Sequence, residues 1–274
     1  MDELAQYNKA RWEGLAQADV SHSRPWLDLD ESSARKRVDR YDMLQEIAGK
    51  QVLCLAAGGG QQSAAFGLLG AQVTVLDLSE TQLARDQLAA NHYGLQIRTI
   101  QGDIRNLSAL KDNSFDLIWQ GYSLEYVPDI SPALAEVARV LRPRGLYYVI
   151  FSNPFTHSCV DEDAWNGESY PLIFPYLDGT EVTSLHPDWT HWDVETEGGN
   201  WVKVPGPKEF RHILSTLING LVRQGFVILG FWEDSSGDLQ AESGSWEHYQ
   251  AFAPPFLSLW ALYRPEVFEP ANHR

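Results

Sequence analysis

The chain has 274 residues, of which 44% are hydrophobic, enough for one large domain or one domain with a substantial insertion. Its 37 acidic and 21 basic residues give a net charge of −16, which argues against a nucleic acid or an anionic membrane surface as partner. No apolar run could cross a bilayer, and the N-terminus lacks the features of a signal peptide. Cys54, in a predicted core strand, and Cys159, in a polar loop, are not expected to form a disulfide, so we expect a cytoplasmic protein.

The first 48 residues predict a helical segment, in which the longer helix covers 31–48 and ends at Gly49. From residue 51 onward, apolar strands alternate with helices. The predicted strands cover 51–56, 72–77, 96–100, 115–120 and 145–152, and the predicted helices cover 61–69, 80–93, 105–111 and 131–142. Fully apolar strands that alternate with helices predict an α/β fold with a parallel sheet covered on both faces.

The alternation stops after Asn153. The segment 154–206 is rich in aromatic residues, proline, glycine and acids, and alternation at 181–185 and 201–204 predicts short antiparallel strands within it. A helix over 207–224 and strands over 225–232 and 256–263 would then complete a mostly parallel seven-stranded sheet. We therefore expect four parts: a helical cap over 1–48, a Rossmann-like core over 49–153, a lid or substrate-binding insertion over 154–206, and a completion of the core over 207–274.

The most informative stretch joins the first strand of this alternation to its first helix. Ala56, Gly58 and Gly60 follow the strand, and Gln61 begins the helix. Glycines allow a ligand to approach the backbone closely, and the N–H groups at a helix start favour a carboxylate or a phosphate. Ligands of open parallel sheets bind beyond the carboxyl ends of the strands. The stretch therefore predicts a site for a nucleoside-bearing cofactor.

Two carboxylates follow the next two strands. Asp77 ends the second strand and Asp103 follows the third, so one can accept both hydroxyls of a ribose while the other holds an adenine amino group. A dinucleotide-binding loop would place glycine at residue 63, where this chain has Ser63. The pair favours an adenosine ligand without a pyrophosphate. An NAD-dependent oxidoreductase on a related fold stays as an alternative.

Residues 50–153, and more weakly 207–263, resemble the class I S-adenosylmethionine-dependent methyltransferases, and in particular a bacterial subgroup of small-molecule methyltransferases. The most specific part of the resemblance is the run 135–145, which matches the helix and turn before the fifth strand. The resemblance implies S-adenosylmethionine as methyl donor, S-adenosylhomocysteine as product and a small-molecule acceptor. By position it implies these cofactor-binding residues: Ala56, Gly58, Gly60, Gln61, Asp77, Leu78, Asp103, Ile104, Gln120 and Gly121.

Two positions depart from the family pattern. Cys54 stands where an acid usually helps to hold the ammonium group of the cofactor, and Ala56 replaces the first glycine. These departures leave a non-catalytic adenosyl-binding module as a further alternative. The amino-acid end of the cofactor would then depend on the backbone at Ala56 and Gln120, or on Arg24 if the N-terminal segment folds over the site. A solvated surface arginine is the other interpretation of Arg24.

Candidate catalytic residues follow the fourth strand and lie in the insertion. In the resembling fold, the loop that carries Tyr122 and Glu125 borders the methyl group and the acceptor, and Glu125 could orient or deprotonate that acceptor. His191, flanked by Trp189 and Trp192, is a candidate base. No Cys/His cluster has zinc-ligand spacing, so we expect no metal. The aromatic insertion is interpreted as a lid with apolar walls for an apolar acceptor, or as the interface of a homodimer.

Overall fold

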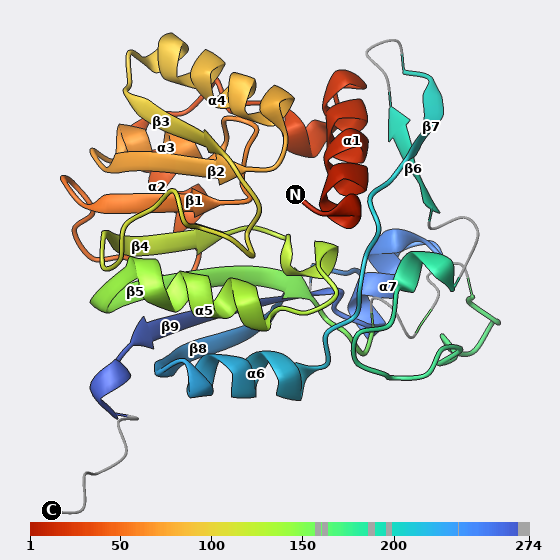
Figure 1. Ribbon diagram of the computed structural model, residues 1–274. Helices are drawn as coiled ribbons and strands as arrows, with labels where there is room; N and C mark the ends of the chain where they lie inside the picture. The colour runs from red at the N-terminus through yellow and green to blue at the C-terminus, as the bar shows by residue number, and fades with distance from the viewer. Residues whose placement is uncertain (157–159, 161–163, 186–189, 196–198, 235, 268–274) are drawn as a thin grey trace, which may run out of the picture.

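The computed structural model describes residues 1–156, 160, 164–185, 190–195, 199–234 and 236–267. It shows one open sheet with helices on both faces, and a separate hairpin beyond the ends of the strands (Figure 1). Cys159 and Trp189 lie outside the described residues. Within the described part of the chain, no helix is long and apolar enough to cross a membrane.

Seven strands form the main sheet in the order β3–β2–β1–β4–β5–β9–β8 (Figure 1). They are β1 Gln51–Leu55, β2 Gln72–Asp77, β3 Ile97–Gln101, β4 Phe115–Gln120, β5 Leu141–Ser152, β8 Phe226–Asp234 and β9 Phe256–Tyr263. The first five pair in parallel, and β9 is antiparallel to both β5 and β8. The prediction of a mostly parallel seven-stranded sheet is confirmed. Strand order reverses between β1 and β4, which is where such sheets bind ligands.

Helices cover the two faces of the sheet and bury two separate cores. The helices α2 Glu31–Val38, α3 Gln62–Leu68 and α4 Glu80–Tyr93 cover one face, and α5 Ser131–Val140 and α6 Leu214–Arg223 cover the other. The side chains of β1 alternate between them, since Val52 and Cys54 are buried in the first core and Leu53 and Leu55 in the second. This double burial explains why the strand is apolar without interruption.

Helix α1, Glu3–Gln17, lies between the carboxyl ends of the strands and the hairpin of β6, His191–Glu195, and β7, Trp201–Pro205 (Figure 1). A small core of Leu15, Val20 and Val194 joins α1 to this hairpin. The predicted strand over 201–204 is thus confirmed as β7. The strand predicted over 181–185 is wrong, because Val182–Ser184 form a 3₁₀ turn.

Several predicted helices have other bounds, for local reasons. α2 ends at Val38 rather than at residue 48, because the Asp39 carboxylate accepts hydrogen bonds from the backbone N–H groups of Met43 and Leu44. α5 ends at Val140, and β5 begins inside the range predicted for that helix. Residues 105–111 form turns, and a short helix that was not predicted, α7 Trp246–Phe252, precedes β9.

The helix predicted over 207–224 is wrong for its first residues, since α6 begins only at Leu214. The backbone before it is extended and bonded to other segments. The N–H of Phe210 donates to the carbonyl of Glu125 (2.6 Å), and the N–H of Arg211 donates to the carbonyl of Thr180 (2.9 Å). These long-range bonds replace the helical ones, and they direct the residues of this stretch toward the ends of the sheet strands.

Candidate functional site

A cavity of about 940 Å³ lies where the carboxyl ends of the strands face α1 and the β6–β7 hairpin. Ala56 and Gly58 come from the β1–α3 loop, Asp77 ends β2, Trp12 lies on α1 and Trp192 lies on β6; all five line the cavity. Ligand cavities in proteins have volumes of roughly 300–1,000 Å³. The volume is therefore sufficient for a nucleoside cofactor together with a small second molecule.

The β1–α3 loop is hydrogen-bonded to a buried carboxyl group, that of Asp86 on α4. Its oxygens accept from the N–H groups of Gly59 (3.2 Å) and Gly60 (3.1 Å) and from the hydroxyl of Ser63 (2.5 Å). Asp86 is fully buried, and that burial raises its pKa to about 7. The sequence analysis missed this residue. The sequence feature that could have revealed it is an acidic residue on the face of α4 that otherwise carries core residues such as Leu83 and Ala89.

Three residues of the loop, Ala56, Gly59 and Gly60, have a positive φ in the left-handed range. Gly60 has a φ of +75°, and a Cβ there would lie 2.5 Å from the carbonyl oxygen of Arg85, so only glycine fits. Gly60 is not among the described residues that line the cavity, and its role is packing against α4. Ala56 keeps a φ of +45° without being glycine, and it lines the cavity as predicted.

The carboxylate of Asp77 is positioned by two backbone donors at the end of β2. Its oxygens accept from the N–H of Gly58 (2.9 Å) and the N–H of Ser79 (2.8 Å), while burial raises its pKa. Leu78 follows it in the cavity wall. Gln82 lies beside them, and its Oε1 is buried with no hydrogen-bond partner within the described residues. An acceptor without a donor is suited to a ligand hydroxyl.

Asp103 and Ile104 line the cavity beyond β3, as predicted. The carboxylate of Asp103 is paired with Arg105, whose Nη2 lies 2.6 Å from Oδ2. The same guanidinium also bonds the carboxylate of Asp2 at 2.8 and 3.0 Å, and Asp2 caps the start of α1. The end of the cavity predicted for the adenine is therefore tied to the helix that covers it.

Three predicted cofactor residues, Gly60, Gln120 and Arg24, are absent from the described lining of the cavity. The amide of Gln120 is buried and bonded within the protein, to the hydroxyls of Ser123 (2.9 Å) and Tyr147 (2.7 Å). The side chain of Arg24 pairs with Asp19 at 2.9 Å and is 45% exposed, which favours the interpretation as a surface arginine. Its backbone carbonyl instead accepts from the amide of Gln61, which does line the cavity, as does Gly121.

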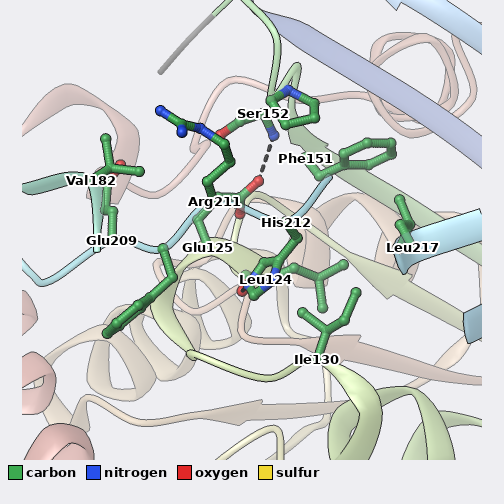
Figure 2. A pocket seen from close by; sticks show the side chains of 12 residues that line it. Leu124, Glu125, Ile130, Phe151, Ser152, Val182, Glu209, Arg211, His212 and Leu217 are labelled. Atoms are coloured by element: carbon green, nitrogen blue, oxygen red, sulfur yellow. Dashed lines mark hydrogen bonds between the residues drawn. The ribbon is translucent and has the colours of Figure 1, made fainter. Parts of the chain in front are cut away.

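The three candidate catalytic residues occupy different places. Tyr122 lines the cavity, with its hydroxyl 2.5 Å from that of Ser152. His191 also lines the cavity, from the hairpin, and its Nδ1 lies 2.8 Å from the hydroxyl of Thr190. Glu125 lies behind the wall, in a neighbouring cavity of about 20 Å³ (Figure 2). The sequence analysis did not select His22, which lines the main cavity between Trp12 and Trp192.

Figure 2 shows the carboxyl group of Glu125 among the residues of the small cavity, with its bond to the backbone N–H of Ser152 dashed. Its second oxygen, Oε2, is buried and has no hydrogen-bond partner among the residues described. His212, on the same cavity, bonds the carbonyls of Leu124 and Val127 instead. Burial raises the pKa of Glu125 to about 7. Glu125 therefore links the loop after β4 to the end of β5 through its buried bond to Ser152.

This burial makes the stability of the protein dependent on pH. The folded protein keeps the Glu125 proton up to about pH 7, whereas the unfolded chain releases it near 4.5. The contribution of Glu125 to the free energy of unfolding is therefore fully present below the pKa of the unfolded chain. It is lost as pH rises through 7, and the loss amounts to up to about 3 kcal/mol. We expect Glu125→Gln to have a smaller loss of unfolding free energy between pH 5 and 8 in urea titrations than the wild type. Glu233→Gln, at an exposed position, should keep the wild-type slope; equal slopes for both variants would contradict the assignment.

The fold and the cavity together define a Rossmann-like enzyme that binds an adenosyl cofactor at the end of β1. A family profile described as "Methyltransferase domain" matches residues 53–149. The uncharacterized methyltransferase YbaJ of Bacillus subtilis (strain 168) is 34% identical over 197 residues, which are 72% of this chain and 73% of that protein. The chain belongs to the class I S-adenosylmethionine-dependent methyltransferases, and its cofactor is S-adenosylmethionine.

Three further relatives agree with this assignment. The crystal structure of an S-adenosylmethionine-dependent methyltransferase from Mesorhizobium loti has a TM-score of 0.63 and 26% identity, covering 86% of this chain and 100% of that one. The ubiquinone biosynthesis O-methyltransferase of Pseudomonas putida (strain W619) is 35% identical over 191 residues, 68% of this chain and 76% of that protein. Its counterpart from strain GB-1 is matched over 52% of its length. The enzyme is thus a methyltransferase rather than the NAD-dependent oxidoreductase or the non-catalytic module kept as alternatives.

The residues of the cavity fit the cofactor of this family. Asp77 and the unpartnered Gln82 oxygen offer acceptors for ribose hydroxyls, and Gly58 leaves the wall beside them without a side chain. Asp103 and Ile104 lie where the adenine is expected. Among the residues that the structure describes, no group of His, Cys, Asp and Glu is arranged to hold a metal ion.

Proposed function

We propose that the enzyme methylates a small-molecule acceptor that lies in the same cavity as the cofactor, beneath a lid formed by α1 and the β6–β7 hairpin. The observation that carries the proposal is the continuity of one cavity from the Asp77 end to a wall of aromatic rings. The net charge of −16 supports a small acceptor rather than a nucleic acid. The relative named for ubiquinone biosynthesis supports it too.

The aromatic wall is a row of rings in edge-to-face contact. Trp12 contacts Trp192 (centroids 5.4 Å apart) and Tyr126 (5.3 Å), Tyr126 contacts Tyr122 (6.1 Å), and Tyr122 contacts Phe256 (5.5 Å). All five residues line the cavity. Rings packed in this way exclude water and offer apolar surface to an acceptor.

Helix α1 is held over the cavity by polar anchors along its length. Asn8 is buried; its amide donates to the carbonyls of Tyr126 (3.1 Å) and Lys208 (3.2 Å) and accepts from the N–H of Lys208 (2.8 Å). Glu13 accepts from the N–H of Glu80 at 2.9 Å, at the start of α4. These bonds support a cap over 1–48 that closes the site together with the insertion 154–206.

When bound, S-adenosylmethionine supplies a methyl group already activated by its sulfonium. The chain then mainly has to hold the acceptor in line with that methyl group and keep water away. Tyr122 and His191 are the proposed residues at the acceptor, since both line the cavity. Glu125 is proposed to position Ser152 and Tyr122 rather than to touch the acceptor. The homodimer and the cytoplasmic location stay predictions.

The test is a methyl-transfer assay with isotopically labelled S-adenosylmethionine. The purified full chain should bind S-adenosylmethionine and S-adenosylhomocysteine in calorimetry and should transfer the label to small aromatic acceptors. Labelling of nucleic acid or of protein substrates, with none of small molecules, would overturn the proposal while leaving the family assignment intact.

The lid is tested by two tryptophans of the same hairpin. Trp192 lines the cavity, whereas Trp201 is 66% exposed and is not part of the described lining. Trp192→Ala removes an aromatic wall, so we expect the KM for an acceptor to rise by about tenfold or more. Trp201→Ala should leave kinetics unchanged. Equal behaviour of the two variants, measured by steady-state kinetics, would contradict a lid function for the hairpin.

A further inference from the structure

The charges that line the main cavity are unbalanced. The described lining contains five acidic residues: Asp77, Asp103, Asp193, Glu209 and Asp234. Arg105 is the only lysine or arginine of that described lining, and Asp103 and Asp2 already pair with it at the adenine end. Desolvation lowers the pKa of His22, which disfavours its charged form. Away from the adenine end, Asp234 pairs with Arg40 at 2.8 Å, and Asp193 and Glu209 are the other acidic residues of the described lining there.

Glu209 is the acid that reaches the junction of the two cavities, since it lines both. Its place depends on the extended stretch before α6. The carbonyl of Glu209 accepts from the N–H of Val182 (2.7 Å), and the next N–H, of Phe210, donates to the carbonyl of Glu125 (2.6 Å). Figure 2 shows Glu209 on the wall shared with Glu125 and Val182. The peptide group between Glu209 and Phe210 is thus bonded on both sides, to Val182 and to Glu125.

The surroundings of Glu209 are aromatic. Glu209, Tyr122 and Tyr126 line the same main cavity. Burial, and after it the charge of Glu209, raises the pKa of both phenols well above the ordinary value. The hydroxyl of Tyr126 is buried without a hydrogen-bond partner among the described residues. Burial and the neighbouring Glu125 raise the pKa of Glu209 to about 8. A carboxyl group beside aromatic rings is the arrangement that binds an ammonium group, through its charge and through the ring faces.

We propose that the acceptor is an amine with an apolar body, whose nitrogen binds at Glu209 beside the rings of Tyr122, Tyr126 and Trp12 and is methylated there. This inference rests on the proposed function. The positive charge of the bound ammonium favours the ionised form of Glu209. That carboxylate then takes one proton from the ammonium, which frees the nitrogen lone pair. That lone pair forms the N–C bond while the C–S bond of the sulfonium breaks and its electron pair goes to sulfur. The products are the N-methylated ammonium and S-adenosylhomocysteine, with the proton on Glu209.

Matched pairs of probes test the inference directly. 2-Phenylethylamine and 2-phenylethanol, and tryptamine and indole-3-ethanol, differ only in an ammonium group in place of a hydroxyl. In calorimetry with the full chain saturated with S-adenosylhomocysteine, we expect the amines to bind about tenfold more tightly, because a charged hydrogen bond is worth more than a neutral one. Glu209→Gln should remove this preference and keep S-adenosylhomocysteine binding. Glu195→Gln, at an exposed position of β6, should retain it.

The outcomes separate the inference from the proposed function. Alcohols that bind as tightly as the amines, or the absence of binding by every probe, would overturn the amine acceptor while S-adenosylhomocysteine binding still supports methyl transfer. Failure to bind S-adenosylhomocysteine would instead count against the cofactor site itself. If Glu209→Gln does not fold, Glu209→Asp keeps the charge and should keep the preference for amines. In either case, the affinities of the wild-type chain for the amines and for the matched alcohols test whether the acceptor is an amine.

Discussion

Replacing Asp77 by alanine is expected to weaken the binding of S-adenosylmethionine by about a hundredfold, because we propose that its carboxylate accepts two charge-assisted hydrogen bonds from the ribose. The same change leaves the N–H groups of Gly58 and Ser79 without their acceptor. Asp77→Asn retains one carbonyl oxygen of the same shape, so we expect a smaller loss of about tenfold. Isothermal titration with S-adenosylmethionine and S-adenosylhomocysteine measures both variants.

The control for Asp77 is Asp28→Ala, an exposed aspartate before α2. It should bind the cofactor like the wild type. Affinities of Asp77→Ala within about twofold of the wild type would show that the ribose is held elsewhere, because one lost charged bond alone exceeds that difference. Thermal unfolding of each variant without cofactor separates lost binding from lost folding.

Replacing Asp86 by alanine is expected to destabilise the protein by about 2–5 kcal/mol, since it removes a buried acceptor from several donors at once. Those donors are the N–H groups of Gly59 and Gly60 and the hydroxyl of Ser63. The loop between β1 and α3 then loses its attachment to α4, so cofactor binding should weaken although Asp86 touches no cofactor. Urea unfolding and cofactor titration measure the two effects separately.

Asn91→Ala provides the comparison on the same helix, at an exposed position of α4. We expect its unfolding free energy to stay within about 0.5 kcal/mol of the wild type. If Asp86→Ala left the unfolding free energy equally unchanged, the loop would be held by its own backbone conformation rather than by the buried carboxyl group. A stable Asp86→Ala that nevertheless binds the cofactor weakly would assign the carboxyl group to positioning alone.

The sheet could be predicted from the sequence because its strands are buried on both faces. A strand such as β1, with alternate side chains in two cores, must be apolar throughout, and that pattern is visible without a structure. The cofactor end of the site was predictable for a related reason. Ala56, Gly58, Asp77 and Asp103 follow strands directly, so the sheet itself places them along one edge.

The acceptor end was not predictable in the same way, because it is built by contacts between segments far apart in the chain. Glu209 was predicted to lie in a helix, because its local sequence pattern is helical. The hydrogen bonds that hold its peptide group instead come from Val182 and Glu125, which are distant in sequence. Arg24 and Gln120 were expected at the cofactor, but Asp19 and Tyr147 satisfy their polar groups. A single sequence does not reveal such partners, because each residue type is compatible with either role.

The anchoring of α1 has a consequence for how the protein is made. The carbonyl partners of Asn8 lie 118 and 200 residues further along the chain. On the ribosome, α1 emerges before these partners, and its hydrogen bonds are incomplete until Lys208 has been synthesised. Chain segments fold as they emerge, so the cofactor-binding strands β1 to β4 are present well before their cover. The nascent enzyme should therefore pass through a stage with an open cofactor site, and that site can close only after Lys208 has been synthesised.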